Sequence, residues 1–319
     1  MKKFFFCAAA AIVALASCSK TQVVYSDAPQ EIGFKAVTGA ITKAESEEPT
    51  TLSGNIDMGV FAFVNDGKAL YFENSRFTAS NNIWTGGQYW PLQSSLDFVV
   101  YAPHGTASYA SNTLTVTGVD NVGKTTIAAQ TDYLYGAEYF DDEDGNGYLK
   151  EQVSTNLKHA LAKVTLNFSG SNVTVNSVYL EKPTLQGSYT VNYSADDPVA
   201  NWGTTTAETT DLQLTEIRGA ELALAVEDNP ETNDVNEAAV AKTASVSIMV
   251  VPAAVSDILI EYKIKGTDDI LDAEIPLTGT WASGTHYIYN ITISPNAIQF
   301  NPPTIADWAQ GAGSNPTIQ

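Results

Sequence analysis

The residue best placed for covalent chemistry is Cys18, which ends the sequence Leu15-Ala16-Ser17-Cys18. A branched apolar residue, two small residues and a cysteine form a bacterial lipobox. At such a site a peptidase cuts between Ser17 and Cys18, and the cysteine thiol becomes the thioether attachment for diacylglycerol. The motif therefore predicts lipidation of Cys18. The alternative is an ordinary signal peptide that is cut nearby, with Cys18 present by chance.

The residues before the lipobox support export. Met1–Lys3 is positively charged, and Phe4–Ala16 is apolar throughout apart from Cys7. This apolar run is shorter than the about 20 residues that a membrane-spanning helix requires. We therefore expect residues 1–17 to be a lipoprotein signal peptide and residues 18–30 a tether. The lipid would then anchor the protein to the membrane, and no polypeptide segment would span it.

Composition excludes several classes of protein. Cys7 is removed with the signal peptide, so the mature chain is predicted to contain no internal disulfide. The formal net charge is −20, and the only arginines are Arg76 and Arg218. Nucleic-acid binding requires a basic surface that can neutralise phosphates, and this sequence has none. The charge indicates instead a protein kept soluble at an exposed surface.

An acidic segment at residues 141–151 partly matches a calcium-binding loop. Asp142, Asp144, Asn146 and Gly147 follow the spacing in which alternate oxygen atoms surround one ion and a glycine makes the sharp turn. The match then fails, because the twelfth position is Val153, where a bidentate carboxylate is expected. The segment is therefore only a weak calcium candidate, and the alternative is a solvated acidic loop. We predict no metal and no cofactor.

The sequence offers little to catalysis. It contains no Gly-x-Ser-x-Gly elbow, no glycine-rich phosphate loop and no cluster of metal ligands. His104, His159 and His286 each lie beside residues typical of strands, which favours structural, hydrogen-bonded histidines. A pair of carboxylates at the spacing used by glycosidases is not excluded by sequence. We predict that the protein is not an enzyme.

Aromatic residues gather in one short segment, where Trp84, Tyr89 and Trp90 lie within seven positions. Such a cluster can stack against sugar rings. Tryptophan also buries a large apolar area, which makes core filling at the end of a β-sandwich the favoured interpretation.

Short segments of β-branched and aromatic residues, separated by Gly, Asn, Asp and Pro, predict an all-β protein. We expect two tandem β-sandwich domains, at residues 31–169 and 170–319. The expected strands are 31–37, 58–64, 96–103, 113–119, 133–140 and 160–170 in the first half, and 173–181, 187–193, 244–252, 257–266, 272–279 and 286–294 in the second.

Taken together, the sequence resembles the fimbrillin family, the subunits of type V pili in anaerobic gut and oral bacteria. Order and spacing carry the resemblance more than any one motif does. The motifs are the lipobox, "IGFKA…TKA" at 32–44, "MGVFAFV" at 58–64, "YWPLQSSLDFVVYAP" at 89–103, "HALAKVTLNF" at 159–168, "YIYNITIS" at 287–294 and "ADWAQG" at 306–311.

The resemblance implies two transthyretin-like β-sandwich domains and export as a lipoprotein to the outer membrane. It also implies that a protease cuts after the first strand, and that a strand from the C-terminal region of another subunit fills the vacated groove. Here the displaced strand would be residues 31–37, with Glu31, Ile32, Phe34, Ala36 and Val37. The cut would fall between Lys43 and Ala44. The donor region would include Ile298, Phe300, Ile305 and Trp308. The implied partners are other fimbrial subunits and a ligand on a host or bacterial surface.

One departure from the family leaves the final form of the protein open. Many relatives carry arginine at the cut, whereas this chain has Lys43. Either a protease that accepts lysine acts there, or the strand is never released and the protein stays anchored by its lipid. A further alternative is a lipid-anchored, glycan-binding monomer that uses the Trp84 and Trp90 region.

The first test follows from the composition of residues 38–55, which carry glycine, proline and acidic residues without strand periodicity. We expect limited proteolysis of the lipid-free protein by a lysine-specific protease to cut first at Lys43, as read by mass spectrometry. Lys43→Gln is the matched control and should remove this first product. A first cut elsewhere, with Lys43 intact, would contradict the expectation.

Overall fold

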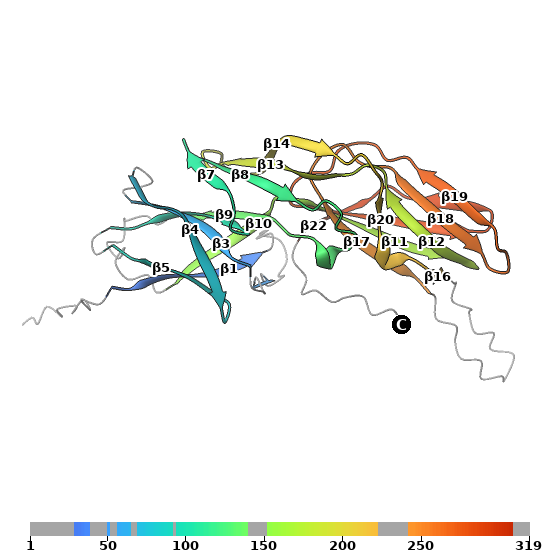
Figure 1. Ribbon diagram of the computed structural model, residues 1–319, viewed down its shortest axis with the longest axis horizontal. Helices are drawn as coiled ribbons and strands as arrows, with labels where there is room; N and C mark the ends of the chain where they lie inside the picture. Colours follow the sequence, from blue (N-terminus) through green and yellow to red (C-terminus); the bar gives the residue numbers. More distant parts are fainter. Residues whose placement is uncertain are drawn as a thin grey trace, which may run out of the picture.

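The fold is taken from a computed structural model, which describes residues 29–38, 50–51, 56–64, 69–91, 94–139, 152–222 and 242–308. These residues form strands and two short 3₁₀ turns, Ile127–Ala129 and Thr215–Ile217, with no α-helix among them. Within this described part, no helix is long and apolar enough to cross a membrane. Figure 1 shows an elongated molecule in which β3, β4, β5 and β9 occupy one half and β18 and β19 the other. The all-β prediction is confirmed.

The first half is built on an eight-stranded sheet that curves until its two ends meet. The strand order is β10-β9-β6-β3-β4-β5-β1-β2, and β1 also pairs with β10. β1 therefore bridges the two sides of the curved sheet. The bounds are β1 Glu31–Thr38, β2 Thr50–Thr51, β3 Met58–Val64, β4 Ala69–Ser80, β5 Ile83–Tyr89, β6 Asp97–Ala102, β9 Leu134–Glu138 and β10 Val153–His159.

A four-stranded sheet packs against the outer face of this curved sheet. Its order is β14-β13-β8-β7, so strands from late in the chain pair with strands from early in it. The bounds are β7 Ala107–Ala110, β8 Thr113–Asp120, β13 Thr184–Asn192 and β14 Ala200–Ala207. β13 and β14 follow residue 169 in the chain but share a sheet with β7 and β8. Strands of the second predicted domain therefore join strands of the first. The division at 169–170 stays a prediction.

The second half consists of two sheets packed face to face around one apolar core. One sheet has the order β17-β11-β20-β21, with β22 also on β20, and the other has the order β15-β12-β18-β19, with β16 on β12. The inward side chains of both sheets form a continuous cluster that includes Phe168, Ile260, Trp281 and Ile291. The bounds are β11 Ala162–Gly170, β12 Val173–Leu180, β15 Leu212–Gln213, β16 Ala220–Leu222, β17 Ala244–Val250, β18 Ile258–Ile264, β19 Ile270–Ile275, β20 Thr285–Ser294, β21 Ala297–Phe300 and β22 Thr304–Asp307.

The strands expected from the sequence are found. Of the strands that it missed, β4 and β14 are mostly exposed or half-buried, whereas β10 alternates in burial along its length. β4 shows the reason most clearly. Most of its side chains are exposed or half-buried, and Asn74 interrupts it with a positive φ of 41°. An exposed strand does not need a regular apolar face, so it leaves no period-two signal. The other strands with no prediction were β2, β5, β7, β10, β14, β15, β16, β21 and β22.

Candidate functional site

The predicted displaced strand, β1, lies between β5 and β10, where the curved sheet closes on itself. We call this place the seam. Its first half pairs antiparallel with β5, where Gly33 faces Thr85 and Phe34 faces Trp84. Its second half pairs in parallel with β10, from Phe34 opposite Val153 to Thr38 opposite Leu157. β1 therefore connects two strands that are otherwise not neighbours in the sheet. Its removal would leave backbone N–H and C=O groups of both β5 and β10 without partners.

The inward face of β1 is fully buried. Ile32, Phe34 and Ala36 each have 0% exposed surface, at the period of two that a strand requires. Phe34 makes edge-to-face contacts with Phe77, at a centroid distance of 5.2 Å, and with Phe98, at 5.1 Å. Burial of each large apolar side chain contributes about 1.5–3 kcal/mol. Without β1, this part of the core would be an apolar groove.

The outward positions of β1 and the residue before it hold the strand by polar contacts. Glu31 Oε1 accepts a hydrogen bond from the Gly87 backbone N–H at 2.9 Å, and the Gln30 carbonyl accepts one from the Trp90 N–H at 2.9 Å. Lys35 is exposed. These contacts can be replaced by water, so most of the cost of removing β1 lies in its buried face and its strand pairing.

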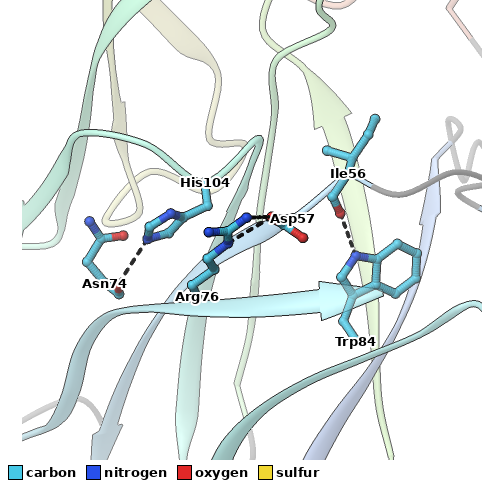
Figure 2. Close-up of polar contacts among 6 residues, drawn as sticks. All are labelled: Ile56, Asp57, Asn74, Arg76, Trp84 and His104. Atoms are coloured by element: carbon cyan, nitrogen blue, oxygen red, sulfur yellow. Dashed lines mark hydrogen bonds and ion pairs between the residues drawn. The ribbon is translucent and has the colours of Figure 1, made fainter. Parts of the chain in front are cut away.

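Ile56 and Asp57, just before β3, are held by contacts with residues of other segments (Figure 2). The Trp84 indole Nε1 donates to the Ile56 carbonyl at 2.7 Å. The Arg76 guanidinium pairs with the Asp57 carboxylate through Nε, at 2.8 Å, and through a second nitrogen. The His104 N–H donates to the Asp57 carbonyl at 2.7 Å. We call this set of contacts the re-entry clamp. None of these contacts is made by a residue of β1, although Trp84 lies on β5, opposite Phe34 of β1.

The predicted donor residues lie on two short strands that pair with β20. β21 pairs with Ile291–Ser294, and β22 pairs with Thr285–Ile288. Ile298 and Phe300 on β21 are half-buried, and the Phe300 ring stacks on Tyr289 at 5.6 Å. Ile305 on β22 is 66% exposed. The structure therefore keeps all the donor candidates on the body of their own chain.

Trp308 fixes the end of the C-terminal segment at the junction of the two halves. Its ring lies parallel to the His159 ring, with centroids 4.0 Å apart and an interplanar angle of 4°. His159 Nδ1 in turn lies 2.8 Å from Asp132 Oδ2, and all three side chains are buried. Trp308 belongs to an apolar cluster that includes Tyr101 from the first half and Met249 from the second. In Figure 1, β22 accordingly lies near the middle of the molecule.

The two tryptophans of the aromatic segment fill the core, as favoured, whereas Tyr89 is 46% exposed. Trp84 is 0% exposed and Trp90 is 9% exposed. The Trp90 ring packs edge-to-face against Phe98, 5.6 Å between centroids. Stacking on a sugar needs an accessible ring face, so the alternative of a glycan platform built on Trp84 and Trp90 is wrong.

The three histidines hold structure. His104 contacts the Asn74 carbonyl at 3.3 Å, and His159 pairs with Asp132 as described. His286 Nε2 lies 2.8 Å from the Thr165 hydroxyl oxygen. Burial, together with the nearby Lys163 charge, lowers the His286 pKa to about 4, so this ring is neutral at pH 7.

Several predicted site residues lie outside the described residues. These are Ser17 and Cys18 at the lipobox, Lys43 and Ala44 at the cut, and Asp142, Asp144 and Asn146 in the weak calcium candidate. The described part of the chain does bring together three other carboxylates, those of Glu181, Asp257 and Glu274, within 4.8 Å of one another. Asp257 already accepts the Leu277 N–H at 2.8 Å, and Glu181 pairs with Lys182 at 3.1 Å.

Sequence reasoning found β1 and missed the residues that enclose it. Phe77 and Phe98 form the walls around Phe34, and Asp57 and Arg76 form the ion pair of the re-entry clamp. The apolar segment that contains Phe98 was expected to be a strand, but nothing in the sequence assigned its neighbours. Arg76 lies within β4, and Arg218 lies on a turn between the second 3₁₀ turn and β16, so both belong to the folded body as expected.

Comparison with known proteins shows the class of protein to which this fold, with its seam around β1, belongs. The fimbrillin-like family matches residues 22–308, so the chain belongs to the fimbrillin-like family. A candidate cell adhesion protein from Bacteroides ovatus ATCC 8483 is similar in structure, with a TM-score of 0.55, 16% identity, and coverage of 89% of this chain and 100% of that one. A fimbrial protein from Bacteroides vulgatus ATCC 8482 has a TM-score of 0.51 and 15% identity, over 79% of this chain and 92% of that one. No curated protein matches the sequence.

The burial of Phe34 predicts a large effect of truncation. We expect Phe34→Ala to lower the free energy of unfolding by about 3–5 kcal/mol, because it leaves a cavity between Phe77 and Phe98. Lys35→Ala is the matched control on the exposed face of the same strand and should change stability by at most about 0.5 kcal/mol. Urea unfolding measures both. Equal effects of the two substitutions would contradict the assignment of the buried face.

The contact between Trp308 and His159 predicts local control of β22. Trp308→Ala removes a burial worth about 3 kcal/mol or more, so we expect the amides of residues 304–307 to exchange at least about tenfold faster with deuterium. Ile305→Ala, at an exposed position of the same strand, should leave their exchange nearly unchanged. Unchanged exchange in Trp308→Ala, measured by mass spectrometry, would show that strand pairing alone holds β22.

Proposed function

We propose that this chain is a structural subunit, stalk or tip, of a type V fimbria that contributes to adhesion and is assembled by proteolysis-triggered strand exchange at β1. The observation that carries this proposal is the position of β1 in the seam. It contributes three fully buried side chains to the core and pairs with both β5 and β10. When a strand in this position leaves, it opens an apolar groove with unpaired backbone groups on both sides. Another strand satisfies both.

The energetics of the groove favour exchange over an empty state. An open groove would expose the core around Phe77 and Phe98 and leave two sheet edges unpaired. A strand from another subunit restores both the apolar burial and the backbone hydrogen bonds along its length. Because the interaction is distributed along a whole strand, a filled groove is expected to open slowly.

The order of events follows from the position of the lipid. In the proposal the chain is exported as a lipoprotein with its lipid on Cys18, and it reaches the outer membrane before the cut at Lys43. The cut separates β1 and its lipid from the body. The contacts of the re-entry clamp at Ile56 and Asp57 are not made by residues of β1, so the proposed cut breaks none of them directly.

The proposed partners are other fimbrial subunits at the cell surface. The donor strand would come from the C-terminal region of the next subunit, which pairs with β20 at the edge of its sheet. An adhesion ligand on a host or bacterial surface is part of the proposal. We also propose that the chain forms two transthyretin-like domains that are divided near residue 169.

If Lys43 is never cut, the same fold serves a different role. β1 then remains in the seam, and the protein stays at the outer membrane as a lipid-anchored subunit that does not polymerise. Residues 38–55 contain no arginine of the kind common in relatives, and this is the observation that keeps the second function in view.

Cutting at Lys43 and observing the product separates the two functions. We expect the cut protein, incubated at high concentration, to form ladders that resist SDS on gels, because each filled groove opens slowly. Intact protein and uncut Lys43→Gln protein should run as single bands. Cut protein that stays strictly monomeric would exclude the polymerising subunit and leave the anchored one.

A further inference from the structure

We propose that the chain binds a neutral sugar residue at a surface patch of its first half, formed around the side chains of Asp97, Tyr109 and Tyr139. We call this patch the tyrosine rim. The inference rests on the adhesion ligand included in the proposed function, and it names the chemical class of that ligand and the surface that holds it. None of the three residues lies on β1 or in the C-terminal segment, so binding here does not depend on strand exchange.

The rim is built on a row of side chains that crosses β4, β3 and β6 and ends just beyond β9. In this row Phe63 of β3 lies opposite Leu70 of β4 on one side and opposite Asp97 of β6 on the other. Tyr139 follows the last paired residue of β9, and continuing the antiparallel register of β6 with β9 by one residue places it opposite Asp97. Residues directly opposite each other in a sheet point to the same face, so these four side chains share one face.

Tyr109 covers only the middle of this row. It comes from β7, an edge strand of the four-stranded sheet, and its ring packs on the ring of Phe63 at a centroid distance of 4.8 Å. Phe63 is therefore 8% exposed, whereas Leu70 and Tyr139, at the two ends of the row, are 54% and 56% exposed. The rim is thus the place where the apolar layer between the two sheets reaches the surface. Its outermost ring, Tyr139, offers the accessible face that the buried tryptophans do not.

A third tyrosine holds Tyr109 in place. The ring of Tyr193, which directly follows β13, lies 6.5 Å from the ring of Tyr109, and its hydroxyl donates to the Gly136 carbonyl of β9 at 3.0 Å. Tyr109 is therefore packed between Phe63 and Tyr193 before any ligand arrives. A ring that is already fixed loses little conformational entropy when a ligand packs against it.

The polar groups of the rim include two donors and an acceptor. Partial burial raises the pKa of Tyr109, and it raises the pKa of Tyr139 to about 12, with the nearby Asp97 charge contributing to both shifts. Both hydroxyls are therefore protonated at pH 7 and can donate, while the Asp97 carboxylate can only accept. This combination matches a sugar residue, whose C–H face packs on an aromatic ring and whose hydroxyl groups both donate and accept hydrogen bonds.

The charge of the rim selects the class of sugar. The formal net charge of the chain is −20, and Glu138 adds a second carboxylate beside Tyr139. No lysine or arginine occurs in the segments that form the rim, which are residues 61–64, 69–72, 97–99, 107–110 and 137–139. An anionic sugar would therefore be repelled without a cation to pair with. An ammonium group would suit the carboxylates, but it cannot accept a hydrogen bond from either tyrosine hydroxyl. A neutral sugar uses the ring, the donors and the acceptor together.

The test uses the uncut, lipid-free Lys43→Gln chain, so that strand exchange plays no part in it. The neutral probes are the methyl glycosides of glucose, galactose, mannose, fucose and N-acetylglucosamine. The methyl glycoside of N-acetylneuraminic acid is the anionic probe, and butylammonium is the cationic probe. Saturation-transfer NMR detects binding, and a ligand-observed titration gives the Kd of each probe.

We expect at least one neutral glycoside to bind, and the anionic glycoside to bind at least about tenfold more weakly. Tyr139→Ala should weaken binding of that neutral glycoside at least about tenfold, because it removes the exposed ring, and Tyr139→Phe should weaken it less, because it keeps the ring. Tyr89→Ala, at a tyrosine of β5 that is 46% exposed, is the matched control and should leave the Kd unchanged. Because Tyr139 is more than half exposed, its variants are expected to unfold at the same urea concentration as the parent chain, which checks that the fold is retained.

Three results would each overturn the inference. Failure of every neutral glycoside to bind, or tighter binding of the anionic or cationic probe than of any neutral one, would show that the ligand class is wrong. Equal binding by Tyr139→Ala and the parent chain would show that the surface is wrong. All these measurements use uncut protein, so a negative result leaves the fimbrial subunit standing without this ligand. Conversely, cut protein that stays monomeric on SDS gels would exclude the polymerising subunit and leave the sugar site untouched.

Discussion

The structure depends most on the closure of the curved sheet by β1. The seam brings together a strand from the start of the chain and β10, and it completes the core around Phe34. If β1 leaves, β2 loses its only neighbour in the sheet, whereas the other strands of that sheet each keep at least one. β1 alone connects the two sides. The closure of the curved sheet and the completion of its core therefore both depend on this one eight-residue strand.

The second structural constraint is the junction between the halves. The exchange of β13 and β14 into the sheet with β8 ties the two halves together by backbone hydrogen bonds, and Trp308 adds a stacked contact at His159. The two halves therefore share an apolar cluster, to which both contribute buried side chains. β10, which pairs with β1 in the seam, ends at His159, so the seam and this junction share a strand.

The sequence predicted the fold class and most of the buried strands because those strands alternate. In β18, Ile258, Ile260 and Tyr262 are buried and the residues between them are half-buried, as the pattern indicated. β4 could not be predicted in the same way, since its exposed side chains are free of any period. β1 was recognised as a strand, but its place in the seam depends on pairing with residues more than 100 positions away, which no local pattern encodes. The same limit applies to His159 and Trp308, whose contact is visible only in three dimensions.

The separation between Phe34 and Val153 has a consequence for how the molecule forms. Pairing of β1 with β10 must close a long loop, whereas β3 with β4 and β4 with β5 close short hairpins. Long-range parallel pairing is slow for this reason, and the re-entry clamp lets the remaining strands assemble first. The seam is thus expected to form after these hairpins, as is the equally long-range parallel pairing of β11 with β20. A strand that pairs after the hairpins can also leave without breaking any contact within them, so the curved sheet can open at its seam while the hairpins β3–β4 and β4–β5 stay paired.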